Sequence, residues 1–209
     1  TEKEVKIETT LSISAIYIQR ILDIQVTWNI QADGTVDIAM DVKRNPIFPM
    51  LPRFGLRLFL PKEMKDVTYY GLGPVESYMD KRRASWHGEF SSPVTDLHED
   101  YIRPQENGSH YDCDYVTLSS NAGHLLPERK TSLTAVSGQT FSFNASVYTE
   151  EELTNKAHHY ELEECGSTVL CLDYRQNGIG SNSCGPQLIE KYRLDENEFH
   201  FELRLKPEV

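Results

Sequence analysis

The chain has 209 residues, and with 39% of them hydrophobic it can bury one substantial core in a single domain. Its 32 acidic residues outnumber the 21 basic ones, and the resulting net charge of -11 repels phosphate backbones and anionic lipid surfaces. We therefore expect no nucleic-acid partner and no membrane partner.

Alternation of apolar and polar residues predicts antiparallel strands along most of the chain. The clearest pattern covers residues 23–43 and runs on both sides of Asp33-Gly34, as a hairpin requires. Further alternation covers residues 54–60, 131–136, 140–147, 168–174 and 199–205. The sequence predicts an all-β fold, a large antiparallel β-sandwich that comprises residues 1–209 as one domain.

One helix is predicted where this alternation stops. It begins at Thr149, whose side chain can cap the exposed amides, and Glu152 can reach back to complete a capping box. Leu153, Ala157 and Tyr160 then share one face at helical spacing.

The stretch from about Gly71 to Gly123 has little periodicity, so we expect an ordered loop that crosses the surface of the sandwich. Near its start, Gly71, Gly73 and Pro74 predict a tight bend in which the glycines take positive φ.

Cysteine and histidine positions do not indicate a metal site. Cys113, Cys165, Cys171 and Cys184 are irregularly spaced, which favours buried free thiols over a disulfide scaffold or a zinc site. Adjacent helical histidines such as His158-His159 point in different directions, so packing or capping is the expected role. We expect no cofactor in this domain.

Several motifs occur in a fixed order along the chain. They are Pro52-Arg-Phe-Gly-Leu56, Gly71-Leu-Gly-Pro74 with Glu76, Tyr78 and Asp80, Pro104-Gln-Glu-Asn-Gly108, Phe141-Ser-Phe-Asn144, His158 before Glu161-Leu162, Leu172-Asp173 with Gln176, and Gly178-Ile-Gly180. Taken together, they resemble the C-terminal domain of glycoside hydrolase family 2 β-galactosidases, which is also the small subunit of two-chain β-galactosidases. The resemblance runs through most of residues 20–205.

The resemblance implies a fold and a function. The fold is a galactose-mutarotase-like supersandwich, incomplete at its N-terminal side because the family's Trp-Arg-Ala-Pro-like opening segment has no match here. An unpaired edge is then exposed or covered by another copy. The function is that of a non-catalytic accessory domain of a retaining β-galactosidase, which hydrolyses terminal β-D-galactosides.

The implied partners are the parent's catalytic barrel, in the same chain or in a separate large subunit, and the galactoside substrate. A homo-oligomer also fits the resemblance. The barrel of the parent can use Mg or Na ions, whereas this domain has no cofactor. The sequence leaves the compartment open between the cytoplasm and the periplasm of a bacterium.

The loop Gly178–Pro186 is the part of the chain that the resemblance connects to substrate. The corresponding loop leans over the sugar site of the barrel, so Asn182, Ser183 and Cys184 are expected at the rim of the pocket. Cys184 stands where some members have Trp, which removes an aromatic stacking platform and leaves Asn182 and Ser183 as hydrogen-bonding groups. The alternative is a tight loop that only joins two strands.

No catalytic residue is predicted, because a retaining glycosidase needs two carboxylates facing one sugar pocket and no barrel motif is present. The acidic residues, Glu76 and Glu106 among them, are interpreted as solvated. One alternative function is a free-standing carbohydrate-binding module that uses the aromatic residues Trp86, Tyr101, Tyr111 or Tyr115. A galactose mutarotase, which needs a histidine and a carboxylate in one pocket, is a further alternative.

Overall fold

The computed structural model of the chain describes residues 4–120, 130–179 and 187–208. They form ten strands, one α-helix and three short 3-10 helices. The strands are β1 (Glu4–Ile13), β2 (Leu22–Gln31), β3 (Val36–Arg44), β4 (Arg53–Pro61), β5 (Asp66–Gly73), β6 (Trp86–Pro93), β7 (His110–Ser119), β8 (Ser132–Ser146), β9 (Ser167–Gln176) and β10 (Glu198–Glu208). The helices are α1 (Glu150–Asn155), η1 (Val94–Leu97), η2 (His159–Glu161) and η3 (Glu190–Tyr192).

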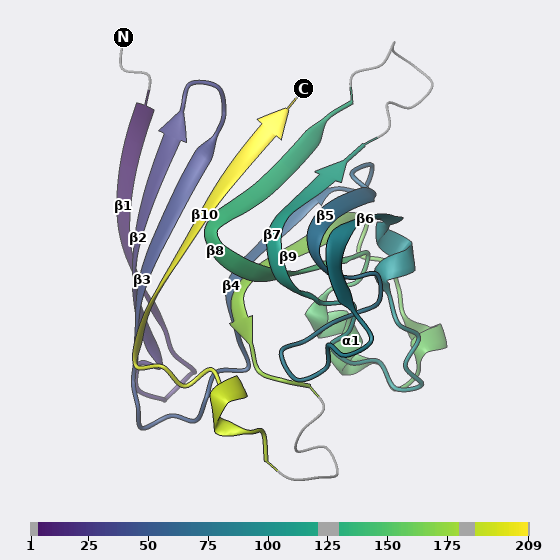
Figure 1. Cartoon of the computed structure of the whole chain (residues 1–209). Coiled ribbons are helices and arrows are strands. Elements are labelled where there is room, and N and C mark those ends of the chain that lie inside the picture. Colours follow the sequence, from purple (N-terminus) through teal and green to yellow (C-terminus); the bar gives the residue numbers. More distant parts are fainter. Residues whose placement is uncertain (1–3, 121–129, 180–186, 209) are drawn as a thin grey trace.

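The strands belong to one antiparallel sheet that folds over on itself (Figure 1). Its main path runs β1-β2-β3-β10-β8-β7-β5-β6, and a branch leaves β8 through β9 to β4. The predicted all-β, antiparallel architecture with one short α-helix is confirmed.

The long strand β8 connects the two layers. Its first five residues, 132–136, pair with β10 and β7, whereas residues 142–146 pair with β9, and Phe141 and Phe143 continue the pairing with β7. Gly138 lies between the two halves, where a Cβ atom would be 2.4 Å from Oε1 of Glu202. Because one strand serves both layers, β4 and β9 are held against the inner face of the main path.

The β2–β3 hairpin forms where the sequence predicts it. Gly34 has φ +88°, and the amide of Thr35 donates to Oδ1 of Asp33 at 2.9 Å. Leu22, Ile24 and Val26 alternate on the buried face of β2. The predicted strands that begin near residues 54, 168 and 199 are likewise present as β4, β9 and β10.

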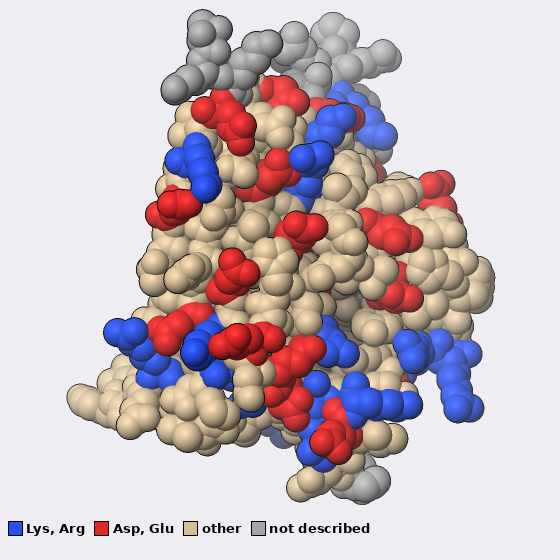
Figure 2. Space-filling view, turned by 60° about the vertical axis from the view of Figure 1, so that its left-hand side comes forward, with Lys and Arg blue, Asp and Glu red and all other residues tan. Residues whose placement is uncertain are grey.

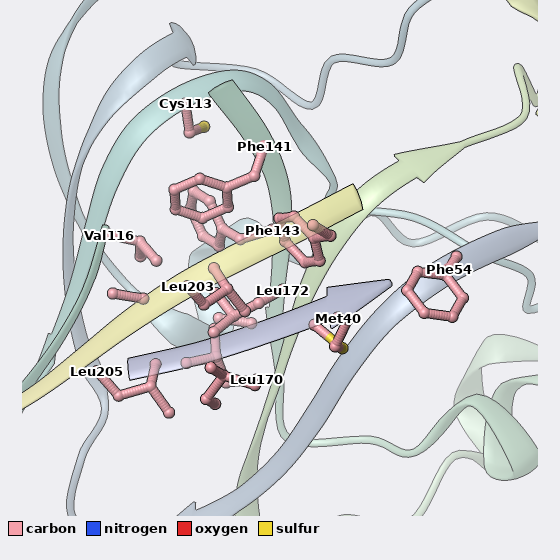
Figure 3. Packing of buried hydrophobic residues seen from close by; sticks show 14 of the residues in the cluster. Met40, Phe54, Cys113, Val116, Phe141, Phe143, Leu170, Leu172, Leu203 and Leu205 are labelled. Carbon is pink, nitrogen blue, oxygen red and sulfur yellow. The ribbon is translucent and has the colours of Figure 1, made fainter. Parts of the chain in front are cut away.

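The core lies between the folded layers. Figure 3 shows labelled side chains from β3, β4, β7, β8, β9 and β10 gathered in one cluster. Phe143, Leu170, Leu172 and Phe201 are fully buried in it. The core thus unites strands that are distant in sequence, which positions the ends of β4, β8 and β9 side by side.

The prediction of a long loop from Gly71 to Gly123 is wrong, since this stretch contains β6 and β7. In β7 the register shifts on both sides of Cys113, so the apolar residues lose their strict alternation. Strand β6 lies at one end of the sheet and pairs only with β5 among the described strands, and none of its residues is fully buried. Both strands therefore lack the sequence pattern of a half-buried strand.

Gly71 and Gly73 do not form the predicted bend with positive φ. Both lie in β5, where a Cβ atom on Gly71 would be 2.4 Å from Sγ of Cys113 and one on Gly73 would be 2.1 Å from the Tyr69 hydroxyl. Close packing, not backbone conformation, requires glycine at these positions.

The predicted helix begins as expected, but it is short. The amide of Glu152 donates to Oγ1 of Thr149 at 3.1 Å, and Leu153 is buried. The helix ends at Asn155 because the carboxylate of Glu161 accepts hydrogen bonds from the next amides, those of Ala157 and His158. Ala157 and Tyr160 therefore do not extend the face of Leu153.

Cys113 and Cys171 are buried free thiols, as predicted, whereas Cys165 is exposed and contradicts that prediction. None of the helices in the described part of the chain is long and apolar enough to cross a membrane.

Candidate functional site

The sequence motifs that lie far apart in the chain meet at one end of the β4–β9 layer. Arg53, the first residue of β4, pairs in register with Gln176, the last residue of β9. Asp173 lies on β9 and Asn144 on the adjacent part of β8, where the two strands pair. Glu106 lies in the connection between η1 and β7 and contacts Asn144. We call these five residues the Arg53 cluster.

Arg53 is the centre of this cluster. Its guanidinium donates to Oδ2 of Asp173 at 2.5 Å, to Oδ1 of Asp173 at 3.2 Å and to Oε2 of Glu106 at 2.9 Å. A guanidinium presents several donors in one plane, so it can hold both carboxylates at once.

The amide side chains complete the network. Asn144 donates from Nδ2 to Oε1 of Glu106 at 2.8 Å, while its Oδ1 accepts from Gln176 at 2.9 Å. Gln176 also donates to Oδ2 of Asp173 at 3.0 Å. Each carboxylate is thereby bonded to both a cation and an amide, as buried charged groups require.

Burial sets the protonation of the cluster. It raises the pKa of Glu106 to about 7, although Arg53 opposes the shift, and it raises the pKa of Asp173 above its ordinary value. Asp173 is 2% exposed, so most of the desolvation falls on this carboxylate. The Arg53 cluster can therefore hold a proton on Glu106 near neutral pH.

A second polar cluster adjoins the first and is centred on Glu76. Its carboxylate accepts from Lys81, from the Tyr101 hydroxyl and from the Gly108 amide, the last at 2.8 Å. Burial alone would raise the pKa of Glu76, but these hydrogen bonds and the charge of Lys81 lower it overall. The turn that supplies this amide requires glycine, because Gly108 has a φ of +68°.

The two clusters are linked. Asn144 donates to the carbonyl of Asn107 at 2.7 Å, next to the amide that binds Glu76. The predicted interpretation of Glu76 and Glu106 as solvated acids is wrong, because Glu106 binds Arg53 and the amide of Gly108 donates to Glu76.

The Arg53 cluster lies beside the beginning of the loop Gly178–Pro186. A Cβ atom on Gly178 would lie 2.2 Å from Cγ of Asp80, so the Asp80 carboxylate is packed directly against the backbone of the loop. The adjoining cavity measures about 310 Å³. It is lined by Met50, Pro52, Arg53, Glu106, Gln176, Asn177, Gly178, Ile179 and Leu188.

The three predicted site residues, Asn182, Ser183 and Cys184, lie outside the described residues. Their position at the rim of a pocket stays a prediction. Sequence reasoning missed Asp173 and Gln176 as parts of a polar site. The sequence did contain a sign of a buried charge, because Asp173 directly follows the apolar run Val169–Leu172 of a strand.

The alternative functions gain little from the geometry. No histidine is among the described residues that line the cavity beside Arg53, whereas a mutarotase would need one. Of the aromatic residues considered for sugar stacking, Trp86 is exposed, while the hydroxyls of Tyr101 and Tyr115 bind Glu76 and Glu89. Among the described residues, no group of three potential ligands could hold a metal ion.

Comparison with known proteins gives consistent results. The family model described as beta galactosidase small chain matches residues 1–205. A β-galactosidase of Actinobacillus pleuropneumoniae is 42% identical over 199 residues, which are 95% of this chain and 19% of that protein. A β-galactosidase of Staphylococcus xylosus is 44% identical over 181 residues, which are 87% of this chain and 17% of that protein.

The chain thus spans about a fifth of the length of these relatives, which is the share expected of one domain or of a small subunit. The order of the motifs, their convergence on the Arg53 cluster and the match over nearly all residues agree. The chain belongs to the β-galactosidase small-chain family.

Proposed function

We propose that the chain is a non-catalytic accessory domain of a retaining β-galactosidase, that it packs beside the catalytic barrel of the parent enzyme, and that its loop Gly178–Pro186 shapes the galactoside pocket. The observation that carries this proposal is the close packing of Asp80 against Gly178, the first residue of the loop, beside a cavity that the Arg53 cluster also lines.

A loop that contributes to a substrate pocket must be held in one place, because misplacement of about 1 Å is enough to weaken catalysis. Buried ion pairs and hydrogen bonds are suited to this task, since their geometry is fixed by several directional contacts. The β4, β8 and β9 ends supply such a support here, and the relatives that the chain resembles are named as β-galactosidases.

The test replaces Asn182 by Ala in the full-length parent enzyme. We expect kcat/KM for a galactoside to fall about 5- to 30-fold, because one hydrogen bond to the substrate is worth roughly 1–2 kcal/mol. The melting temperature should stay nearly unchanged. Gln187→Ala is the matched control, since it removes an exposed amide just outside the loop.

Loss of stability with unchanged kinetics would show that the loop has only a structural role. Unchanged values of both would remove the loop from the substrate pocket.

A further inference from the structure

A hollow lies on the outer face of the sheet, away from the core, at the point where β8 turns from one layer into the other. β8 pairs with β10 over residues 132–136 only, and at Gly138 it brings no side chain to the wall of the hollow. The hollow measures about 390 Å³. Ligand pockets usually measure about 300–1,000 Å³, so its size is that of a small-molecule site.

Polar side chains from four strands line this hollow. They are Asn29 on β2, Asp37 on β3, Ser137 on β8, and Glu202 and Arg204 on β10. Asn29 and Arg204 each lie directly opposite Asp37 in the adjacent strand, so the three side chains share the outer face. Ala39 lies opposite Glu202, and its small side chain leaves space beside the carboxylate.

These polar groups keep hydrogen-bonding capacity for a ligand. Arg204 donates to Asp37 from Nε at 2.5 Å and from Nη2 at 3.0 Å, and a guanidinium has five donors. The carboxylate of Glu202 lies 3.8 Å from Nε2 of His200, which is beyond hydrogen-bond distance. The hollow therefore offers both donors and acceptors.

An aromatic surface adjoins the hollow. Val136, which lines it, pairs with Arg204 on one side and with Tyr115 on the other, and Tyr115 pairs in turn with Tyr70. Directly paired residues share a face, so both tyrosines lie on the outer face, about 5 and 10 Å beyond Val136. The Tyr115 hydroxyl donates to Glu89 at 2.5 Å, which orients its ring, and Tyr70 is 38% exposed.

We propose that this surface, which we call the outer-face site, is a second carbohydrate-binding site. One sugar unit of an oligosaccharide occupies the hollow among Asp37, Glu202 and Arg204, and the following units lie against Tyr115 and Tyr70. The site binds sugar without cleaving it, and the proposal is independent of the role of the loop Gly178–Pro186.

The chemistry of a sugar matches this combination of groups. Neighbouring hydroxyls of a sugar ring donate to carboxylates and accept from a guanidinium, while the apolar face of the ring packs on an aromatic side chain. The relatives are named as β-galactosidases, so we assign an oligosaccharide that contains a galactosyl unit.

The charges of the outer-face site favour a neutral ligand. A phosphorylated ligand would meet the carboxylates of Asp37 and Glu202 beside the single guanidinium of Arg204. On the face of the molecule that Figure 2 shows, acidic and basic side chains are likewise interspersed among uncharged areas. The net charge of -11 disfavours an anionic ligand further.

Photoaffinity labelling of the full-length parent enzyme tests the proposal. The probe is an S-linked analogue of lactose that resists hydrolysis and carries a diazirine at its reducing end. We expect labelled peptides from β3, β7, β8 or β10 in addition to any from the catalytic pocket, and excess unlabelled analogue should suppress both. No labelling of these four strands, or labelling that the unlabelled analogue does not suppress, would overturn the proposal.

Glu202→Ala removes one acceptor of the hollow, and Glu198→Ala is the matched control because Glu198 lies on the same face of β10 but does not line the hollow. We expect Glu202→Ala to lower labelling of the four strands about tenfold, and Glu198→Ala to leave it unchanged. Labelling of the catalytic pocket and kcat/KM for a chromogenic galactoside should be unchanged in both variants. Equal labelling of the four strands in the two variants would overturn the proposal, whereas the turnover of Asn182→Ala reports on the loop alone.

Discussion

Arg53 is the residue on which the polar cluster depends most strongly. Replacing it with Met would keep much of the side-chain volume but leave Asp173 and Glu106 without their cation. Removal of one partner from a buried pair costs about 3–5 kcal/mol, and we expect a loss of that size in the free energy of unfolding from urea denaturation.

Arg57→Met is the matched control, since Arg57 lies two residues further along β4 and binds the surface carboxylates of Glu150 and Glu151. A half-exposed ion pair of this kind is worth at most about 1 kcal/mol. Equal losses in the two variants would contradict the central role of Arg53.

Glu106 makes the stability of the chain depend on pH. Its pKa rises from the ordinary value of 4.5 to about 7 on folding, chiefly because of burial, so the folded state binds more protons than the unfolded state between these values. The contribution of Glu106 is therefore largest below pH 4.5 and is lost as the pH rises to 7. We expect this loss to be of order 1–3 kcal/mol.

Other groups titrate in the same range, among them His110, whose pKa burial lowers to about 4 and whose contribution has the opposite sign. The informative quantity is thus the difference between the wild-type chain and Glu106→Gln, which cannot titrate. We measure the change in the free energy of unfolding from pH 5 to pH 8 for both proteins. This change should be more destabilising for the wild type than for Glu106→Gln. Parallel pH profiles for the two proteins would refute the assignment.

At the scale of the element, helix α1 rests on a single cap. Thr149→Ala removes the oxygen that accepts from the Glu152 amide, and loss of such a cap costs about 1 kcal/mol. Thr154→Ala in the same helix is the control, because Thr154 only donates to the carbonyl of Glu150 and alanine is the better helix former. Urea denaturation should show a lower free energy of unfolding for Thr149→Ala but not for Thr154→Ala. Similar free energies of unfolding for the two variants would contradict the capping role.

The strands that could be predicted from sequence are those with one regularly buried face. β2, β3 and β10 alternate without interruption, so a period of two residues identifies them. β7 could not be recognised because its bulges place His110, Cys113 and Val116 on the buried side at a spacing of three residues instead of two. A bulge is decided by the neighbouring strand, and this information is not local in the sequence.

The candidate site could be predicted from the sequence only in part, for a related reason. The motif residues Arg53, Glu106 and Asp173 stand out individually as charges next to apolar runs. Their meeting depends on β8, which turns from one layer into the other and so brings Asn144 to β9. Sequence spacing gives no indication of that turn, and the acids were therefore interpreted as solvated.

At the scale of the whole molecule, the arrangement of layers accounts for what the chain can do alone. The ends of β4, β8 and β9 carry a polar cluster beside the beginning of one loop, while the side between β1 and β4 remains open and apolar among the described residues. Both features are suited to contact with further polypeptide. The side between β1 and β4 is lined mainly by apolar side chains, and the cavity beside Arg53 measures about 310 Å³.

The isolated 209-residue chain should therefore not hydrolyse a chromogenic β-galactoside. A retaining glycosidase requires two carboxylates about 5–5.5 Å apart with the glycosidic bond between them. Glu106 and Asp173 are two carboxylates that share one partner beside a cavity, and that partner, the guanidinium of Arg53, is bonded to both, which leaves no room for a sugar between them. The measurement is the release of the chromophore by the purified chain, compared with the full-length enzyme at equal molar concentration. Turnover that survives purification and disappears in Glu106→Gln would show that this pair is catalytic and would overturn the assignment of an accessory role.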